Sequence, residues 1–227
     1  MQAHIFKILE KKELTKDVFE LILERPEGFS FEAGQFFTAK IEDITPPCFR
    51  GYSIASGPSK ANIELCIKVV EGGRGSNWLN SLKKDDNLTG IGPNGKFTLQ
   101  NSNKDILIVA TGTGIAPFKA MLEEHLKDLS QKVHLVFGVR YVEDIFYKDL
   151  LEELAEKHPN FTYDITVSRP EESYEGNKGR VTEILQNYGI NNQEVYICGL
   201  KDMIDSVSEI LKSKGLPEEQ IHFEKYD

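Results

Sequence analysis

Residues 105–117 read DILIVATGTGIAP, and this stretch decides the fold of the second half of the chain. Residues 106–110 form a continuous apolar run, as is typical of a parallel strand that is covered on both faces. Gly112 and Gly114 follow directly, and Pro117 suits the first turn of a helix. A strand, a glycine loop and a helix in this order predict the start of a doubly wound α/β domain.

Strands and helices continue to alternate from this loop to the end of the chain. One face of the helix after the loop is expected to carry Phe118, Met121, Leu122, His125, Leu126 and Leu129. Further strands are predicted at 133–139, 161–168, 194–199 and 221–226, with helices between them at 146–157, 181–187 and 203–211. This order predicts a parallel sheet with right-handed crossovers.

Residues 1–102 have a different pattern, in which short strand candidates are separated by turn residues. Alternation is clearest at 62–70, where one predicted face carries Ile63, Leu65, Ile67 and Val69 and the other carries Glu64, Cys66 and Lys68. Without a long helix, this half is expected to be a small antiparallel barrel or sandwich. The polar stretch QNSNK at 100–104 is the predicted junction. The fold class is therefore two-domain: an N-terminal antiparallel β-barrel at 1–102, followed by a C-terminal α/β doubly wound parallel sheet at 103–227.

Composition excludes several classes of protein. The chain has 227 residues, a net charge of −9 and three cysteines, none in a Cys-x-x-Cys pair. The negative charge argues against nucleic acid or an anionic membrane as the main partner. Neither cysteines nor histidines have the spacing of metal ligands, so no metal site is predicted. No apolar run approaches the ~20 residues that cross a bilayer and no secretory signal is visible, so a cytoplasmic protein is expected. No feature predicts an oligomeric state.

The glycine loop at 111–117 is a candidate phosphate site. Gly112 and Gly114 allow close approach of the backbone, and N–H groups at a helix start favour a phosphate or pyrophosphate. A tight strand-to-helix turn without a ligand is the plain alternative. The strand before the loop and the helix behind it favour phosphate, because the motif requires that context.

The third predicted strand of this half bears on nucleotide choice. It ends in VSRP, and the loop behind it contains KGR, so Ser168, Arg169 and Arg180 are candidates for one anion site. No acidic residue stands where a ribose 2′-hydroxyl would be held, and arginine forks suit phosphate. This favours the 2′-phosphate of NADPH, with NADH possible. Two solvated loop arginines are the alternative.

The first half contains a second glycine loop, EGGRGS at 71–76, which leads into a predicted short helix with Ser76 as a plausible N-cap. Its backbone amides could face a pyrophosphate, and a tight turn with a capped helix is an equal alternative. A nearby strand, FRGYSIAS at 49–56, is interrupted by Arg50, Tyr52 and Ser53, which combine charge, ring and hydroxyl.

Taken in order, the stretches RGYSIAS, EGGRGS, GPNGKF, ATGTGIAPF, VSR, KGR, YICG and FEKY resemble the plant-type ferredoxin–NADP reductase family and its flavin-reductase relatives. The resemblance runs across nearly the whole chain. It implies an FAD-binding barrel followed by a nicotinamide-dinucleotide domain, without an iron–sulfur domain.

The resemblance also implies roles for the residues of the first half. Arg50 pairs with the flavin phosphate, Tyr52 lies against the isoalloxazine, and Ser53 hydrogen-bonds near the flavin N5. Each role fits its side chain, which is a fixed charge, a planar face or a hydroxyl. The loop that contacts the flavin phosphates is matched by Gly73, Gly75 and Ser76.

In the second half, the resemblance implies a nicotinamide-dinucleotide loop at Gly112, Thr113, Gly114 and Pro117. Cys198, with Gly199, lies beside the nicotinamide and the flavin, and Glu224 relays a proton or positions the nicotinamide. The plain alternatives are a buried small residue for Cys198 and a solvated strand residue for Glu224. Tyr226 is similar to the aromatic that covers the flavin in plant-type members, where it ends the chain; here Asp227 follows, and fraying of the terminus is the alternative.

The expected activity is hydride transfer from NADPH to bound FAD, with Ser53, Cys198 and Glu224 as catalytic candidates, followed by electron transfer to an acceptor. Ferredoxin or flavodoxin is the first candidate for the acceptor. Free flavin or an oxygenase component is the second. A noncatalytic flavin-bearing relay subunit is the alternative from another class of function.

Overall fold

The computed structural model describes residues 3–41, 46 and 48–226. The chain divides into two compact units, each described here by itself: unit 1 is Met1–Leu99 with Ala116–Glu124, and unit 2 is Gln100–Ile115 with His125–Asp227. The domain boundary predicted between residues 102 and 103 stays a prediction. Among the described residues, no helix has both the length and the apolar character that a membrane span requires.

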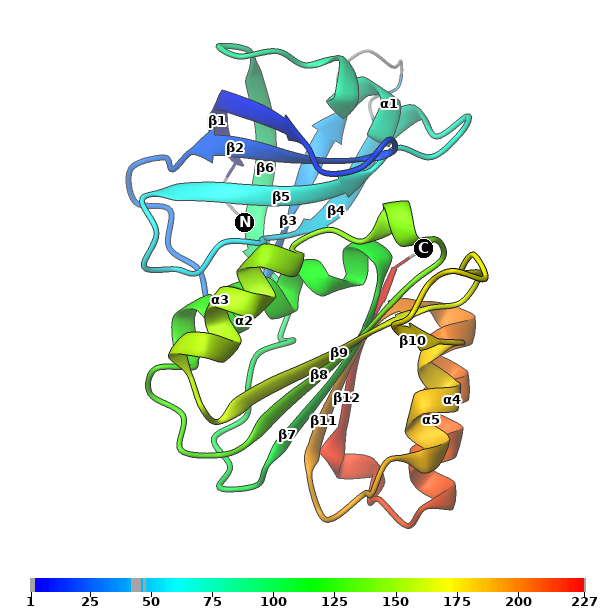
Figure 1. The fold of residues 1–227 in the computed structure, drawn as a ribbon. Coiled ribbons are helices and arrows are strands. Elements are labelled where there is room, and N and C mark those ends of the chain that lie inside the picture. The colour runs from blue at the N-terminus through cyan, green and yellow to red at the C-terminus, as the bar shows by residue number, and fades with distance from the viewer. Residues whose placement is uncertain (1–2, 42–45, 47, 227) are drawn as a thin grey trace. The chain divides into compact units, whose positions relative to one another are not determined.

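Unit 1 is an antiparallel barrel of six strands among its described residues (Figure 1). In chain order its elements are β1 (Ala3–Glu13), β2 (Val18–Glu24), β3 (Phe36–Ile41), β4 (Cys48–Ser53), β5 (Asn62–Lys68), α1 (Arg74–Ser81) and β6 (Asn87–Asn94). The strands pair in the order β4-β3-β6-β1-β2-β5. An antiparallel bridge between Ile54 and Leu65 links the chain after β4 to β5 and so brings the two ends of the sheet together.

Aromatic rings fill the core of this barrel. The rings of Phe6 and Phe37 stack with their centroids 4.7 Å apart, and Phe29 meets Phe6 edge-on at 5.1 Å. Gly90 makes this packing possible, because a Cβ at that position would lie 2.6 Å from the ring of Phe37. Stacked and edge-on pairs of this kind are the favoured geometries of aromatic side chains.

The helix α2 (Ala116–His125) belongs to unit 1 except for its last residue, although its sequence lies beyond the predicted junction. Its Phe118 ring meets the ring of Phe97 at 5.6 Å, and Met121 lies so close to Gly34 that an added Cβ there would be 2.5 Å from Met121 Cε. The helix therefore packs on the barrel through apolar side chains. The helix ends at His125, whereas its apolar face was predicted to continue to Leu129.

The face of β5 that was predicted to be polar is partly covered. Ile63, Leu65 and Ile67 are buried as predicted, but Cys66 is also buried and Glu64 is half-buried. The expectation of a strand with one solvated face is therefore wrong for these two residues. For Glu64, the physical reason is that Lys119 of α2 pairs with it on this face.

Unit 2 contains a parallel sheet with strand order β10-β9-β8-β7-β11-β12. Its strands are β7 (Ile106–Thr111), β8 (Val133–Val139), β9 (Phe161–Val167), β10 (Asn177–Lys178), β11 (Glu194–Leu200) and β12 (Ile221–Tyr226). The helices are α3 (Lys148–Lys157), α4 (Val181–Asn187) and α5 (Lys201–Ser213), with single 3-10 turns η1 (Gly112–Ile115), η2 (Val142–Asp144) and η3 (Glu218–Gln220). Helices α4 and α5 lie on one face of the sheet and α3 on the other (Figure 1).

The predicted fold class is confirmed, and the strand order shows where unit 2 can bind a ligand. The chain runs outward from β7 through β8 and β9, then returns to the other side of β7 with β11 and β12. The direction thus reverses between β7 and β11. In open α/β sheets, ligands bind beyond the carboxyl ends of the strands at such a switch point.

Candidate functional site

The candidate flavin residues of unit 1 lie at the end of β4. Arg50 and Tyr52 stand opposite Ala39 and Phe37 of β3, and Ser53 is the last residue of the strand. Arg50 is exposed, Tyr52 is half-buried and Ser53 is buried. Burial raises the pKa of Tyr52 to about 12, so its phenol remains neutral and keeps its proton at neutral pH.

The glycine loop of unit 1 packs directly on these residues. A Cβ at Gly75 would lie 3.2 Å from Cγ of Arg50 and 3.5 Å from the hydroxyl of Tyr52. Gly75 is thus the residue that lets the start of α1 approach β4. The structure brings the predicted set of Arg50, Tyr52, Gly73, Gly75 and Ser76 together in one unit.

The predicted N-cap role of Ser76 is wrong. Gly73 occupies the N-cap position, the helix α1 begins at Arg74, and Ser76 lies within its first turn. The Ser76 hydroxyl instead stabilises the loop: it accepts a hydrogen bond from the Val70 N–H at 3.0 Å and donates one to the Gly73 carbonyl at 3.3 Å. The hydroxyl therefore fixes the turn before the helix.

These residues fit a flavin dinucleotide. The exposed Arg50 guanidinium supplies a permanent positive charge, and the first N–H groups of α1 have no carbonyl partner within the helix, so both can bind phosphate. The neutral phenol of Tyr52 presents a planar face next to them. A larger residue at 75 would fill the space between the loop and the strand.

In unit 2, the predicted phosphate loop forms the turn η1, which directly follows β7. A Cβ at Gly114 would lie 2.3 Å from the carbonyl oxygen of Cys198, at the end of β11. Gly112 has a φ of +52°, and a Cβ there would have no neighbour within 4 Å. The loop is therefore pressed against β11 at Gly114 and open at Gly112, which fits a backbone cradle for a dinucleotide phosphate.

Cys198 and Gly199 continue this site along β11. In the register of the sheet, Cys198 lies opposite Ala110 of β7 on one side and Glu224 of β12 on the other. Gly199 lies opposite Lys225 of β12. Gly199 has a φ of +155°, and a Cβ there would lie 2.4 Å from the hydroxyl oxygen of Thr111. The carboxyl ends of three neighbouring strands thus meet at the switch point.

The Cys198 thiol is fully buried and protonated at neutral pH. Burial raises its pKa well above the ordinary range, the Glu224 carboxylate raises it further, and a hydrogen bond with the Tyr226 side chain opposes them. Tyr226 stands opposite Leu200, at the end of β12. The structure thus brings Cys198, Glu224 and Tyr226 together; Asp227 lies outside the described residues. A neutral thiol of this kind is a poor nucleophile.

The candidate 2′-phosphate residues lie on two adjacent segments. The N–H of Gly179 donates to the Val167 carbonyl at 2.9 Å, which sets Arg180 beside Ser168. Arg169 and Arg180 are both exposed. The N–H of Arg169 also donates to the Arg140 carbonyl at 2.8 Å, so the backbone of a third arginine lies beside Arg169. The sequence contained no signal that Arg140 lies beside Arg169.

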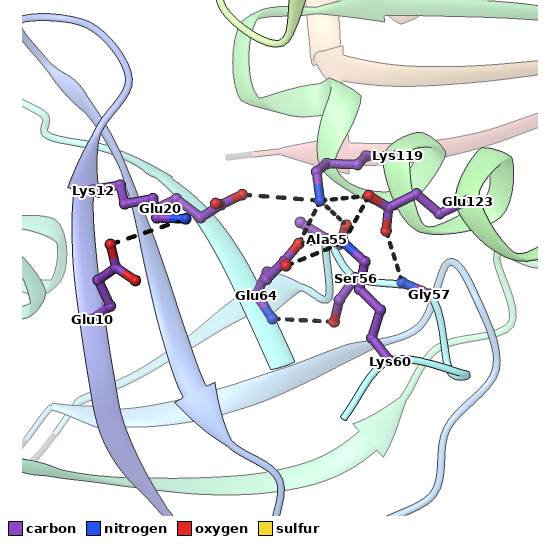
Figure 2. Close-up of polar contacts among 10 residues, drawn as sticks. All are labelled: Glu10, Lys12, Glu20, Ala55, Ser56, Gly57, Lys60, Glu64, Lys119 and Glu123. Atoms are coloured by element: carbon purple, nitrogen blue, oxygen red, sulfur yellow. Dashed lines mark hydrogen bonds and ion pairs between the residues drawn. The ribbon is translucent and has the colours of Figure 1, made fainter. Parts of the chain in front are cut away.

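A buried group of charges in unit 1 was not foreseen. Lys119 of α2 pairs with Glu64 and with Glu123, and Figure 2 shows these side chains converging on its ammonium group. Lys119 and Glu123 stand four residues apart, which is also the spacing of ordinary pairs on solvated helix surfaces. The sequence therefore held no signal that Lys119 is buried.

Family models match both halves of the chain. An oxidoreductase FAD-binding domain matches residues 5–99, and an oxidoreductase NAD-binding domain matches residues 108–209. The first match covers the barrel strands, and the second covers the sheet strands from β7 to β11 together with most of α5.

Known relatives extend this result to the full chain. Ferredoxin–NADP reductase B of Sorangium cellulosum is 36% identical over 100% of this chain and 100% of its own length. The toluate 1,2-dioxygenase electron transfer component of Pseudomonas putida is 34% identical over 78% of this chain, and the match covers only 54% of that longer protein. A solved ferredoxin NADP+ reductase from Neisseria gonorrhoeae, with bound FAD and NADP, has the same fold, with a TM-score of 0.88, 24% identity and 99% of both chains covered.

Proposed function

Because this chain belongs to the ferredoxin–NADP reductase family and is an FAD-dependent NAD(P)H oxidoreductase, we propose that it passes electrons from NADPH to a small electron-transfer protein, ferredoxin or flavodoxin. The observation that carries this proposal is the match to a ferredoxin–NADP reductase over the full length of both chains. When bound, FAD supplies the redox chemistry, since it accepts hydride from the nicotinamide and releases electrons to the acceptor.

The residues of this chain bind the flavin and the nicotinamide dinucleotide and orient them. In the proposal, Arg50 and the start of α1, with Gly73, Gly75 and Ser76, hold the flavin phosphates. Tyr52 lies against the ring system, and its neutral phenol adds no charge there. The Ser53 hydroxyl hydrogen-bonds at the reactive edge, where a hydroxyl can donate or accept.

The nicotinamide dinucleotide is proposed to bind at the switch point of unit 2. Gly112, Thr113, Gly114 and Pro117 provide the phosphate loop, and the open space at Gly112 supports this assignment. Cys198 and Gly199 at the end of β11 position the nicotinamide, and Glu224 positions it or relays a proton. Tyr226 is proposed to cover the flavin.

Selection of NADPH over NADH is assigned to Ser168, Arg169 and Arg180. The support is that residues 167 and 179 are hydrogen-bonded, so that the residues after them lie side by side. Two exposed guanidinium groups at this edge suit the doubly charged 2′-phosphate.

A second candidate acceptor is free flavin or an oxygenase component, and it is favoured by the relatives that are named as dioxygenase electron transfer components. A noncatalytic flavin-bearing relay subunit is the third candidate, and it would not oxidise NADPH. A panel of acceptors tests all three: NADPH-dependent reduction of ferredoxin or flavodoxin at a higher kcat/KM than free FMN or FAD supports the proposal. Preference for free flavin would contradict it.

The proposed location is the cytoplasm. All three cysteines of the chain are free thiols in the described structure, which suits a reducing compartment. Fractionation of the native host, with the chain detected in the cytoplasmic fraction, tests this assignment; recovery from the periplasm would contradict it.

A further inference from the structure

Lys119 is buried inside unit 1, on the helix that follows the dinucleotide loop. Only 6% of its surface is exposed, and no other lysine among the described residues is buried. Lysine is almost never fully buried unless its charge is paired. The burial of this charge therefore calls for partners, and the structure provides several.

Lys119, its three carboxylate partners and a second lysine form the Lys119 cluster, which consists of Lys119, Lys60, Glu20, Glu64 and Glu123 (Figure 2). The Lys119 ammonium contacts Glu123 at 3.0 Å and Glu20 at 4.0 Å, and it also pairs with Glu64. Lys60 pairs with Glu64 at 3.2 Å and with Glu123 at 2.9 Å. The cluster thus contains two cations and three carboxylates.

Lys119 and Glu64 each favour the charged form of the other. Burial by itself lowers the pKa of Lys119, but the carboxylates of Glu123, Glu64 and Glu20 outweigh burial and hold the pKa above its ordinary value. Burial by itself raises the pKa of Glu64, but Lys119 and Lys60 outweigh burial and hold this pKa below its ordinary value. The ion pair between Lys119 and Glu64 is therefore intact at neutral pH.

Two residues of the cluster, together with Glu124 of α2, form hydrogen bonds with the backbone of the chain that follows Ser53. Lys119 donates a hydrogen bond to the carbonyl oxygen of Ala55 at 3.1 Å. The N–H of Gly57 donates to Glu123 at 3.2 Å, and the N–H of Ser59 donates to Glu124 at 2.9 Å. Residues 55–59 are thus fastened to α2 by their backbone, starting two residues after the serine proposed to face the flavin.

The same segment also forms hydrogen bonds with β5. The N–H of Ala55 donates to the Glu64 carbonyl at 2.7 Å, and the N–H of Glu64 donates to the Ser56 hydroxyl at 3.1 Å. Because Glu64 also pairs with Lys119, one residue of β5 connects the segment and the helix. The helix itself begins at Ala116, directly after the loop Gly112–Ile115.

We propose that Lys119 is a positioning residue for flavin reduction, because its buried ion pairs hold the chain after Ser53 on the helix that continues the dinucleotide loop. This inference rests on the proposed function. A well-packed apolar residue could fill the same place without charge, so a purely stabilising role does not require the ion pairs. The positioning role does require the ammonium group, since it donates a directed hydrogen bond to the Ala55 carbonyl.

Three variants and two readouts test the proposal. Lys119→Met removes the charge, and Lys119→Arg keeps it. The double variant Lys119→Met with Glu123→Gln removes one charge of each sign, so it keeps the net charge of the cluster. It tests the positioning role if the single variant Lys119→Met does not fold. Lys157→Met is the matched control, because Lys157 forms an exposed ion pair with Glu153 on α3.

The first readout is hydrogen exchange without nucleotide. In the two methionine variants, the backbone N–H groups of the non-proline residues in 55–59 are expected to exchange about tenfold faster or more, whereas those of α3 do not change. The second readout is the limiting rate of anaerobic flavin reduction, expected to fall about tenfold or more because small displacements of reacting groups are costly. The Kd for NADP+ stays within about twofold, and Lys119→Arg recovers most of the rate.

The outcomes separate the two levels of inference. Unchanged exchange at residues 55–59 in the double variant would overturn the role of Lys119. Faster exchange with a wild-type rate of flavin reduction would also overturn it, since the residue would then be structural only. Wild-type protein whose FAD is not reduced by NADPH would instead overturn the proposed function.

Discussion

Gly114 lies so close to Cys198 that a Cβ added to the glycine would stand 2.3 Å from the cysteine's carbonyl oxygen and 2.7 Å from its carbonyl carbon. Backbone atoms cannot move aside as a flexible side chain can. The contact joins the loop after β7 to the end of β11, which are the two strands on either side of the switch point. It therefore fixes the proposed dinucleotide loop at the carboxyl edge of the sheet.

Gly114→Ala is expected to weaken NADP+ binding about tenfold or more, because overpacking against backbone displaces the loop. FAD content stays at the wild-type level, since the residues proposed to hold the flavin phosphates lie in unit 1. Calorimetric titration with NADP+ and the flavin absorbance of the same samples provide both numbers. Gly189→Ala is the control, because a Cβ there has no neighbour within 4 Å. Equal affinity of Gly114→Ala and wild type for NADP+ would contradict the loop assignment.

Ser53→Ala is expected to lower the limiting rate of anaerobic flavin reduction by NADPH about tenfold or more, because the hydroxyl positions the reactive edge. FAD binding and NADP+ affinity stay near wild type, since Arg50 and both glycine loops are intact. Stopped-flow spectroscopy with NADPH in excess measures this rate. Flavin reduction at wild-type speed would show that the hydroxyl has no such role.

Replacing Arg169 and Arg180 with alanine is expected to raise the KM for NADPH about 10- to 100-fold, the loss expected for charge-assisted hydrogen bonds. The KM for NADH changes little, because NADH has no 2′-phosphate. Steady-state kinetics with both nucleotides measures the difference. Equal losses with NADPH and NADH would reject the 2′-phosphate assignment, and Lys157→Ala on α3 controls for the change in surface charge.

The buried Cys198 thiol makes stability depend on pH in a defined direction. Burial raises its folded pKa above the ordinary value of 9.0, so the folded protein holds the proton more tightly than the unfolded chain does. This contribution is fully present below that value and is lost as the pH rises toward the folded pKa. Between about pH 7 and about pH 10, wild type is expected to lose more unfolding free energy in urea than Cys198→Ala does. Identical losses would show that the thiol does not titrate this way.

Most of the fold could be predicted because its patterns are local. The apolar run before Gly112 predicted β7, and the helix at Val181–Asn187 and the strand at Ile221–Tyr226 have the predicted bounds. The two-residue strand β10 was not foreseen, because its short segment has no periodicity. The prediction that Ser76 is the N-cap of α1 was wrong, because its hydroxyl hydrogen-bonds to the loop before the helix.

Long-range burial is the part that the sequence could not predict. Glu64 and Cys66 alternate with apolar residues as a solvated face would, but Cys66 is buried and Glu64 pairs with Lys119 of α2. Lys119 stands in a helix with ordinary charge spacing, so its burial depends on partners from β2 and β5 that are distant in sequence. The candidate site residues stand in short sequence motifs that point to a ligand. The residues of the Lys119 cluster stand in no such motif.

Anaerobic addition of NADPH to the purified protein tests the central claim most directly. The protein as isolated, or after incubation with FAD, is expected to be yellow, and NADPH is expected to bleach the flavin absorbance without oxygen, faster than NADH does. Bound flavin that neither nucleotide bleaches would contradict the assignment of this chain as an FAD-dependent NAD(P)H oxidoreductase.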